Sequence, residues 1–269
     1  YGISNIIYLL IYHVIRYRRE VVIKNISNSF PEQSAQENKK ITKRFYKHFA
    51  DMMVESIKLF SISREKVVLR CKVNNPELIN KYYDSGQHII LVGGHYNNWE
   101  MLAVAMNIQI KPTVVGIYAP LSNKFFDKTF ANSRTKYGTE LVSKRKVKEY
   151  FQDLETPFKA IVFGSDQSPQ HVRENTYWTT FLNQATPVMF GSEKYATEYN
   201  LPVIYFSINK VKRGYYETEF SLITDQPKEM EYTAITETHT RLLEQQIIQK
   251  PEFYLWTHKR WKHKPPKGQ

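Results

Sequence analysis

The feature that most constrains the fold is an alternation of short apolar runs with stretches of helical pattern after residue 62. Runs typical of strands occur at 66–73, 87–95, 111–120, 139–143 and 159–169, and two more flank Arg213-Gly214 as a hairpin. Helical patterns lie between them at 76–86, 98–108 and 123–138, and a last helix is expected at 233–249. Because such alternation is typical of strands that share one sheet with helices on both faces, the sequence predicts an α/β fold. We expect a central mixed, largely parallel sheet flanked by helices, with an N-terminal helical extension.

Residues 1–62 have a helical pattern with a break at Ser27–Ser34, so we expect an N-terminal helical region there and an α/β domain over 63–269. One continuous domain is the simplest arrangement. The first region starts with the apolar run Ile3–Ile15 and continues into the basic run Arg16–Lys24. A membrane-spanning helix needs roughly 20 apolar residues, so two interpretations stay open. The run is the end of a longer membrane anchor with a basic cytoplasmic flank, or it is an amphipathic helix packed on the core. Because the chain starts with Tyr1 rather than methionine, a truncated or processed start is expected.

The composition of the chain restricts its partners. The net charge is +12 over 269 residues, which predicts a polyanionic partner: nucleic acid, an anionic membrane surface or an acidic carrier. The 19 tyrosines suit a membrane interface, because one end of the ring is apolar and the other is polar. The single cysteine, Cys71, excludes an intrachain disulfide and a cysteine-based metal site.

The stretch GGHYNNWE, residues 93–100, carries the strongest candidate for chemistry. It follows the apolar run Ile89–Val92, so a buried strand ends in two glycines and places His95 at the carboxyl edge of the sheet. In open α/β sheets ligands bind at this edge. If Glu100 lies in the first turn of the next helix, its carboxylate can accept a hydrogen bond from one imidazole nitrogen of His95 and make the other nitrogen a general base. The glycines would let the backbone turn and leave room for a substrate.

The alternative interpretation is a capping or core histidine with an unrelated surface glutamate. Other kinds of site lack their motifs. The H-E-x-x-H spacing and a cysteine pair are missing, so no metal is expected. Nucleotide-binding G-x-x-x-x-G-K-[ST] and G-x-G-x-x-G patterns and the serine-hydrolase G-x-S-x-G are missing as well, and no cofactor is expected.

The GGHYNNWE stretch matches the H-x-x-x-x-D/E signature of the lysophospholipid acyltransferase superfamily, and the chain more narrowly resembles the bacterial lipid A late acyltransferases. Four later stretches agree with that family in its order. They are 117–142 (with the Y-x-P-L-x-N segment and Arg134), 162–169 (with Asp166), 181–204 and 251–266. Residues 16–32 resemble its region after the membrane anchor. The first motif alone would be weak evidence for this resemblance, but five matches in the family's order over nearly the whole chain are specific evidence for it.

The resemblance implies acyl transfer from an acyl thioester to a hydroxyl of a membrane glycolipid. His95 would deprotonate the hydroxyl, with Glu100 as its orienting partner. Backbone N–H groups beside Gly93, Gly94 or Gly164 are candidates for stabilising the oxyanion.

Four residues are expected to bind substrate. Arg134 is expected to bind a phosphate of the glycolipid or of the carrier. Asp166 would line the site or bind hydroxyls of the acceptor, or else cap a turn. Gly94 and Asn98 of the same GGHYNNWE stretch complete the set of expected substrate-binding residues.

The resemblance also implies partners and a location. The donor would be acyl carrier protein or another acyl thioester, the acceptor a glycolipid such as a lipid A precursor, and the surface an anionic membrane, with no nucleic acid. Because acyl carrier protein is cytosolic, the place would be the cytoplasmic face of the inner membrane of a Gram-negative bacterium.

Three alternatives stay open. Ala119 stands where several family members carry a basic residue, so the acceptor could instead be an aminolipid, a phosphoinositol mannoside or a pigment alcohol. The same dyad could activate water and act as a thioesterase. The basic tail 257–268, which contains Lys259, Arg260, Lys262, Lys264 and Lys267, could belong to a non-catalytic module that binds nucleic acid. His171, His258 and His263 lack an evident partner and are expected to be structural or surface residues.

Overall fold

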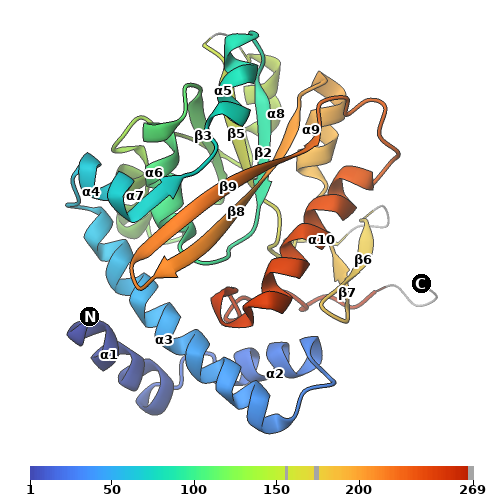
Figure 1. The fold of residues 1–269 in the computed structure, drawn as a ribbon. Coiled ribbons are helices and arrows are strands. Elements are labelled where there is room, and N and C mark those ends of the chain that lie inside the picture. Colours follow the sequence, from blue (N-terminus) through green and yellow to red (C-terminus); the bar gives the residue numbers. More distant parts are fainter. Residues whose placement is uncertain (155–156, 173–175, 266–269) are drawn as a thin grey trace.

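The computed structural model describes residues 1–154, 157–172 and 176–265 (Figure 1). Its larger sheet has seven strands in the order β1-β9-β8-β2-β5-β3-β4. Neighbouring strands are parallel except in the antiparallel hairpin β8–β9, so the expected mixed, largely parallel sheet with flanking helices is confirmed. The strands are β1 (Cys71–Val73), β2 (Ile89–Gly93), β3 (Thr113–Tyr118), β4 (Glu140–Ser143), β5 (Lys159–Gly164), β8 (Val203–Lys212) and β9 (Tyr215–Thr224).

Helices precede the sheet and cover both of its faces (Figure 1). The N-terminal helices are α1 (Gly2–Leu9), the π-helical turn η1 (Leu10–Val14), α2 (Arg19–Ser29) and α3 (Ala35–Leu59). The later ones are α4 (Arg64–Arg70), α5 (Glu77–Asp84), α6 (Trp99–Gln109), α7 (Lys124–Thr135), α8 (Val147–Gln152), α9 (Gly191–Tyr199), α10 (Ala234–Gln249) and the 3₁₀ turn η2 (Pro251–Phe253).

Alternate residues of the central strand β2 enter two separate hydrophobic clusters. Ile90 and Val92 pack with residues of α9, α10 and the N-terminal helices, whereas Ile89 and Leu91 pack with α5 and α6 on the other face. A strand that is buried on both faces has an uninterrupted apolar sequence. This is why the run Ile89–Val92 predicts a buried strand correctly.

The strand expected over Lys66–Val73 is wrong for most of its length. Helix α4 occupies this stretch up to Arg70, and only Cys71–Val73 is a strand. Val67 is fully buried while Leu69 is 68% exposed, and the next fully buried residue is Cys71, four positions after Val67. That spacing belongs to a helical face rather than to a strand.

A small second sheet and helix α9 were not expected from the sequence. The second sheet is the antiparallel hairpin β6 (Trp178–Phe181) and β7 (Gln184–Pro187). Leu182 and Asn183 between its strands have φ angles of 49° and 60°, which is the left-handed geometry of a two-residue hairpin turn. Asparagine at position 183 suits this turn, because it tolerates a positive φ better than most residues.

The first helices share the core of the sheet. Ile11, Val22 and Ile26 are buried in the same hydrophobic cluster as Ile90. In the described part of the chain, no boundary in the core separates these helices from the sheet, and the division into two regions at residue 62 stays a prediction. Helix α1 lies against α3, as expected for an amphipathic first helix, and it exposes Ile3 and Ile6 on its outer side. Among the described residues, none of the helices is long and apolar enough to cross a membrane.

A buried polar cluster ties α1 to α3 and to the β8–β9 hairpin. The carboxylate of Asp51 accepts hydrogen bonds from Arg213 Nε at 2.9 Å and Nη2 at 2.6 Å, and another from the hydroxyl of Ser4. Lys210 Nζ lies 3.6 Å from the same carboxylate. Burial raises the pKa of Asp51, but these partners outweigh it, so its pKa lies below the ordinary value.

Asp51→Ala is expected to lower the free energy of unfolding by about 3 kcal/mol, because it leaves Lys210 and Arg213 without their buried counter-charge. Urea unfolding followed by circular dichroism measures the change. Asp225→Ala, at an exposed aspartate, serves as the control and is expected to stay within about 0.5 kcal/mol of the parent. Equal effects of the two substitutions would contradict a stabilising role of the cluster.

Candidate active site

Two neighbouring strands of the sheet bring His95 and Asp166 together. Strands β2 and β5 are parallel with Gly93 opposite Gly164, and the N–H of Ser165 donates to the carbonyl of Gly93 at 3.1 Å. The segments that follow therefore leave the same edge side by side. His95 Nδ1 lies 2.7 Å from Oδ1 of Asp166, although the two residues are 71 positions apart in the chain. The side chain of Asp166 is 3% exposed and that of His95 is 23% exposed.

The glycines around His95 are packed against protein side chains. A β-carbon on Gly164 would lie 3.0 Å from Cε1 of His95, so the imidazole rests directly on this glycine. A β-carbon on Gly94 would lie 2.5 Å from Leu243, and one on Gly93 would lie 2.4 Å from Phe206. The room that we expected these two glycines to leave for substrate is filled by the core. A role of their backbone N–H groups stays a prediction.

The hydrogen bonds of His95 define which of its two ring nitrogens carries the proton and which one can accept a proton. An ionised carboxylate only accepts, so Nδ1 of His95 carries the proton and donates to Asp166. Nε2 then holds a lone pair, which accepts from the side-chain amide of Gln167 at 3.1 Å. Trp99 packs edge-on against the ring with centroids 5.1 Å apart. The ring is thus held in the tautomer that a general base requires.

The charges around the pair favour a basic imidazole. Burial lowers the pKa of His95, but the charge and hydrogen bond of Asp166, together with the charge of Glu100, raise it above the ordinary value. Burial raises the pKa of Asp166, but His95 and the guanidinium of Arg260 outweigh this effect and lower it. Asp166 is therefore ionised at neutral pH and able to orient the imidazole.

Glu100 lies in the first turn of α6, as expected, but its hydrogen bonds differ from the expectation. Its carboxylate pairs bidentately with Arg134 of α7, at 2.9 Å from Nε and 2.6 Å from Nη2. The indole N–H of Trp99 also donates to it at 3.1 Å. Asp166 occupies the imidazole nitrogen that we expected Glu100 to hold. Arg134, expected to bind a phosphate, has its Nε and Nη2 engaged by Glu100.

The turn between β2 and α6 is built by two asparagines. Asn97 has a φ of 52°, and its amide donates to the carbonyl of Ile208 at 2.7 Å. Asn98 caps α6 by accepting from the N–H of Met101 at 2.9 Å, and it donates to Glu55 at 2.6 Å. Asn98 is fully buried, and both ends of its amide are used within the protein. Its burial indicates a structural role, and the substrate-binding role that the sequence suggested stays a prediction.

The last part of the described chain packs beside Asp166. Trp256 is fully buried and Arg260 is 2% exposed, with its Nη1 donating to the carbonyl of Pro187 at 2.8 Å. His258 Nε2 accepts from the N–H of Ser168 at 3.0 Å. The expected basic tail is thus partly a buried structural segment. Lys259, Lys262 and Lys264 are exposed, and Lys267 lies outside the described residues.

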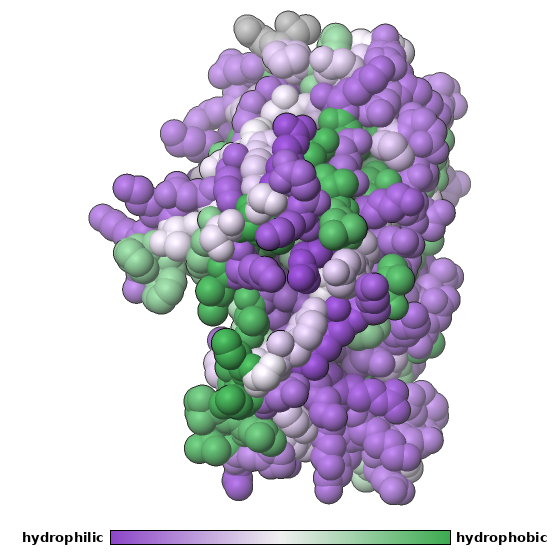
Figure 2. Space-filling model, turned by 60° about the vertical axis from the view of Figure 1, so that its left-hand side comes forward, coloured by the Kyte–Doolittle hydropathy of each residue, from purple (hydrophilic) through white to green (hydrophobic). Residues whose placement is uncertain are grey.

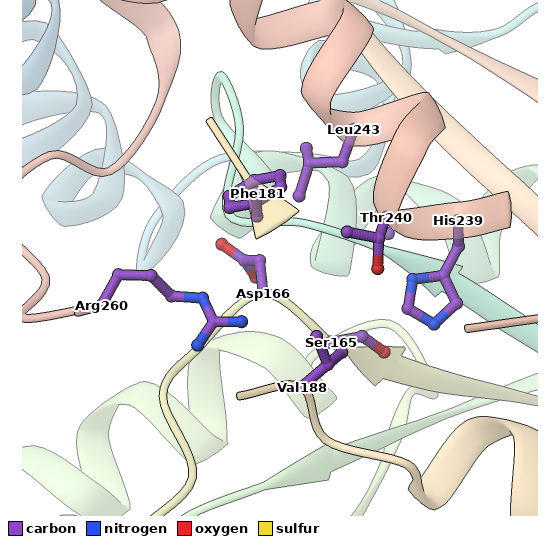
Figure 3. A pocket seen from close by; sticks show the side chains of 9 residues that line it. Ser165, Asp166, Phe181, Val188, His239, Thr240, Leu243 and Arg260 are labelled. Carbon is purple, nitrogen blue, oxygen red and sulfur yellow. The ribbon is translucent and has the colours of Figure 1, made fainter. Parts of the chain in front are cut away.

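A small cavity lies next to Asp166, on the side facing α10 (Figure 3). Arg260 reaches toward Asp166 from the C-terminal segment, while His239 and Thr240 project from α10. Burial lowers the pKa of His239 and of His258 to about 4, so both stay neutral at pH 7. Arg260 is consequently the cation of this cavity that acts on Asp166. Sequence reasoning did not assign Gln167, His239 or Arg260 to the site. Gln167 directly follows Asp166 in the chain, whereas His239 and Arg260 reach the site only through tertiary packing.

A buried carboxylate and a tautomer-fixed imidazole lie together at the carboxyl edge of the sheet, and the unprotonated Nε2 accepts from Gln167. Such a pair can deprotonate a hydroxyl or a water that replaces Gln167 at Nε2. Among the described residues, no group of three or more histidine, cysteine, aspartate or glutamate side chains could hold a metal ion. Transferases and hydrolases that use a general base have this kind of arrangement.

Comparison with known proteins identifies the family within this class. The family of bacterial lipid A biosynthesis acyltransferases matches residues 3–263, and the chain belongs to it. A lipid A biosynthesis palmitoleoyltransferase of Escherichia coli (strain K12) is 21% identical over 260 residues, which cover 92% of this chain and 80% of the relative. A lipid A biosynthesis acyltransferase of Shigella flexneri shows the same identity and coverage. Family membership supports an acyltransferase.

Asp166→Asn is expected to lower the pKa of His95, because it removes the nearest negative charge and the charged hydrogen-bond acceptor. Glu100→Gln is expected to lower it less, because Glu100 acts on the imidazole only through its charge. NMR titration of ¹³C-labelled histidine measures both, with the His95 signal assigned from the spectrum of His95→Gln. An equal or larger effect of Glu100→Gln would show that Glu100 is the closer partner in solution.

Arg134→Gln is expected to move the pKa of His95 in the opposite direction. The guanidinium of Arg134 lowers this pKa, so its removal leaves the carboxylate of Glu100 unopposed and stabilises the imidazolium. The same titration measures the rise, and Lys128→Gln on the exposed side of α7 is the matched control. A fall in the pKa would mean that Glu100 leaves the site when Arg134 is lost.

Proposed function

We propose that this protein transfers a fatty acyl chain from an acyl thioester to a hydroxyl of a glycolipid, with a lipid A precursor as the acceptor to test first. The observation that supports this most directly is the His95–Asp166 pair, in which the buried carboxylate binds Nδ1 and leaves Nε2 unprotonated. Membership of the lipid A acyltransferase family supplies the reaction class. The proposed chemistry needs neither a metal nor a cofactor.

In the proposed reaction, Nε2 of His95 takes the proton of the acceptor hydroxyl, and the oxygen of that hydroxyl attacks the thioester carbonyl. The new C–O bond forms and the carbonyl becomes a tetrahedral oxyanion, whose stabilisation we assign to backbone N–H groups beside Gly93, Gly94 or Gly164. The C–S bond then breaks, and the imidazolium returns its proton to the leaving thiolate. The products are an ester and a free thiol. Gln167, which contacts Nε2 in the structure, has to yield this position to the hydroxyl.

The two carboxylates near His95 have different roles in this proposal. Asp166 orients the imidazole and stabilises the imidazolium, which is the role that the sequence suggested for Glu100. Glu100 instead holds Arg134 beside the site and adds negative charge near the ring. The Nη1 edge of Arg134 is not engaged by Glu100, and we assign to it the binding of a phosphate of the glycolipid or of the carrier.

The proposed donor is acyl carrier protein, and the proposed place is the cytoplasmic face of the bacterial inner membrane. The net charge of +12 suits an acidic carrier and an anionic lipid surface alike. A non-catalytic module that binds nucleic acid through the C-terminal segment is less well supported. Its Trp256 and Arg260, which such a module would present to bases and phosphates, are buried.

His95→Ala is expected to lower kcat by about 10³-fold or more, because it removes the general base, and Asp166→Asn by about 10²–10⁴-fold, because the tautomer is lost. The assay uses a radiolabelled acyl-carrier-protein thioester with lipid A precursors and other lipid acceptors in mixed micelles. His171→Ala, at an exposed histidine in the segment after β5, is the control and should retain the parent rate. Free fatty acid without lipid product would assign the site to thioester hydrolysis.

The pH dependence of kcat/KM offers an independent check of the base. Because the unprotonated imidazole is the active form and its pKa is raised, activity should fall as the pH drops through a value above that of free histidine. In Asp166→Asn the same acid limb should move to lower pH while the plateau falls. If the acid limb of the kcat/KM profile were at the same pH in Asp166→Asn as in the parent, His95 would be excluded as the titrating group.

A further inference from the structure

The start of helix α7 carries large apolar side chains that face solvent. Phe125 is 73% exposed and Phe126 is 52% exposed, and Leu121, just before the helix, is 50% exposed. Neighbouring exposed aromatic side chains at the tip of one element are unusual for a surface with no partner. Helix α7 therefore presents an apolar end that something else is expected to cover.

This end of α7 is joined to further exposed apolar residues on α3 and α1. Phe130, one turn after Phe126, packs edge-on against Phe60 at the end of α3, with centroids 5.9 Å apart. Earlier along α3, Ile57 is 64% exposed, and α1, which lies against α3, exposes Ile3 by 68%. Figure 2 shows apolar side chains gathered along the left-hand edge of this face of the molecule. We call this set the apolar band; it comprises Ile3, Ile6, Leu10, Met53, Ile57, Phe60, Leu121, Phe125 and Phe126.

The charges beside the apolar band have one predominant sign. Lys58 on α3 and Lys124, Lys128 and Lys136 on or next to α7 are exposed. The acidic residue of α7, Asp127, is half-buried and accepts from the backbone N–H of Leu121 at 2.8 Å. An apolar strip with lysines beside it matches a lipid layer with anionic headgroups, because the rings enter the headgroup and acyl boundary while the ammonium groups meet phosphates.

The position of α7 connects this surface to the active site. Its first turn holds Phe125 and Phe126, whereas its last turn holds Arg134, which pairs with Glu100 beside His95. We propose that the apolar band is the surface by which this protein docks on an anionic membrane, with the first turn of α7 inserted in the headgroup layer. The proposal rests on the proposed function for the nature of the acceptor. It also defines which side of the molecule faces the membrane. On that side the first turn of α7 contacts the lipid, and its last turn lies beside His95.

The docking surface is tested by flotation of the chain with vesicles made of equal amounts of phosphatidylglycerol and phosphatidylcholine. Phe125→Ser combined with Phe126→Ser should weaken binding by about tenfold or more, because two aromatic side chains no longer enter the interface. Leu222→Ser combined with Ile248→Ser is the matched control, since it removes two exposed apolar side chains from β9 and α10. Thermal unfolding of both double variants confirms that they fold. Equal binding of the two variants would overturn the proposal.

The anionic part of the proposal has its own test. Lys124→Gln combined with Lys128→Gln should weaken binding to the same vesicles by about tenfold, and added salt should reduce the difference between this variant and the parent. Equal binding of the parent to vesicles of pure phosphatidylcholine would overturn the assignment to an anionic surface. Loss of self-association, rather than of vesicle binding, in the phenylalanine variant would also overturn it, because the band would then be a contact between copies of this chain.

Acyl transfer in detergent micelles separates this proposal from the proposed function. The phenylalanine variant should retain transfer to an acceptor that is dissolved in micelles and lose it with the acceptor in vesicles. If the parent chain transfers no acyl group in micelles but the band variants still lose vesicle binding, the proposed function fails while the docking surface stands. If transfer persists and vesicle binding is unchanged, only the docking surface fails.

Discussion

The parallel pairing of β2 with β5 is the constraint on which the site depends. Because Gly93 lies opposite Gly164, the two strands end at the same level, and the residues that follow have to leave the sheet together. His95 comes two residues after one glycine and Asp166 two residues after the other. The imidazole can rest on Gly164 only because that position has no β-carbon. A shift of this register by one residue would reverse the faces and separate the acid from the base.

The N-terminal helices support the active site rather than only extending the fold. Glu55 on α3 is buried and accepts from the amide of Asn98 at 2.6 Å and from the hydroxyl of Tyr216 at 2.8 Å. Burial raises the pKa of Glu55, although these two hydrogen bonds lower it. Since Asn98 caps α6, this carboxylate joins α3 to the turn that carries His95 and to strand β9. Removing the first helices would therefore disturb the turn that carries His95 as well as the core.

Much of the fold was predictable because it depends on local pattern, and the pairing within the site was not, because it depends on strand order. The run Ile89–Val92 and the carboxyl-edge position of His95 follow from periodicity and from two glycines. The candidate residues His95, Glu100, Arg134 and Asp166 do lie together. Which carboxylate meets the imidazole, however, depends on β5 being the neighbour of β2, and sequence spacing favoured the nearer Glu100. Arg260 reaches the site only through tertiary packing, whereas Gln167 is the neighbour of Asp166 in the chain and could have been included with it.

The two carboxylates near His95 differ in what neutralises them, and this separates their effects on the base. Glu100 shares its charge with Arg134 through two hydrogen bonds, so the effects of this pair on the imidazole largely oppose each other. Asp166 has no arginine in direct contact among the described residues, and Arg260 acts on it only across a small cavity. A buried carboxylate is stable only when it is paired, so the imidazolium is the partner that Asp166 favours most. The site therefore gains its base strength from the charge of Asp166, which is balanced by the positive charge that the imidazole acquires when its Nε2 takes up a proton.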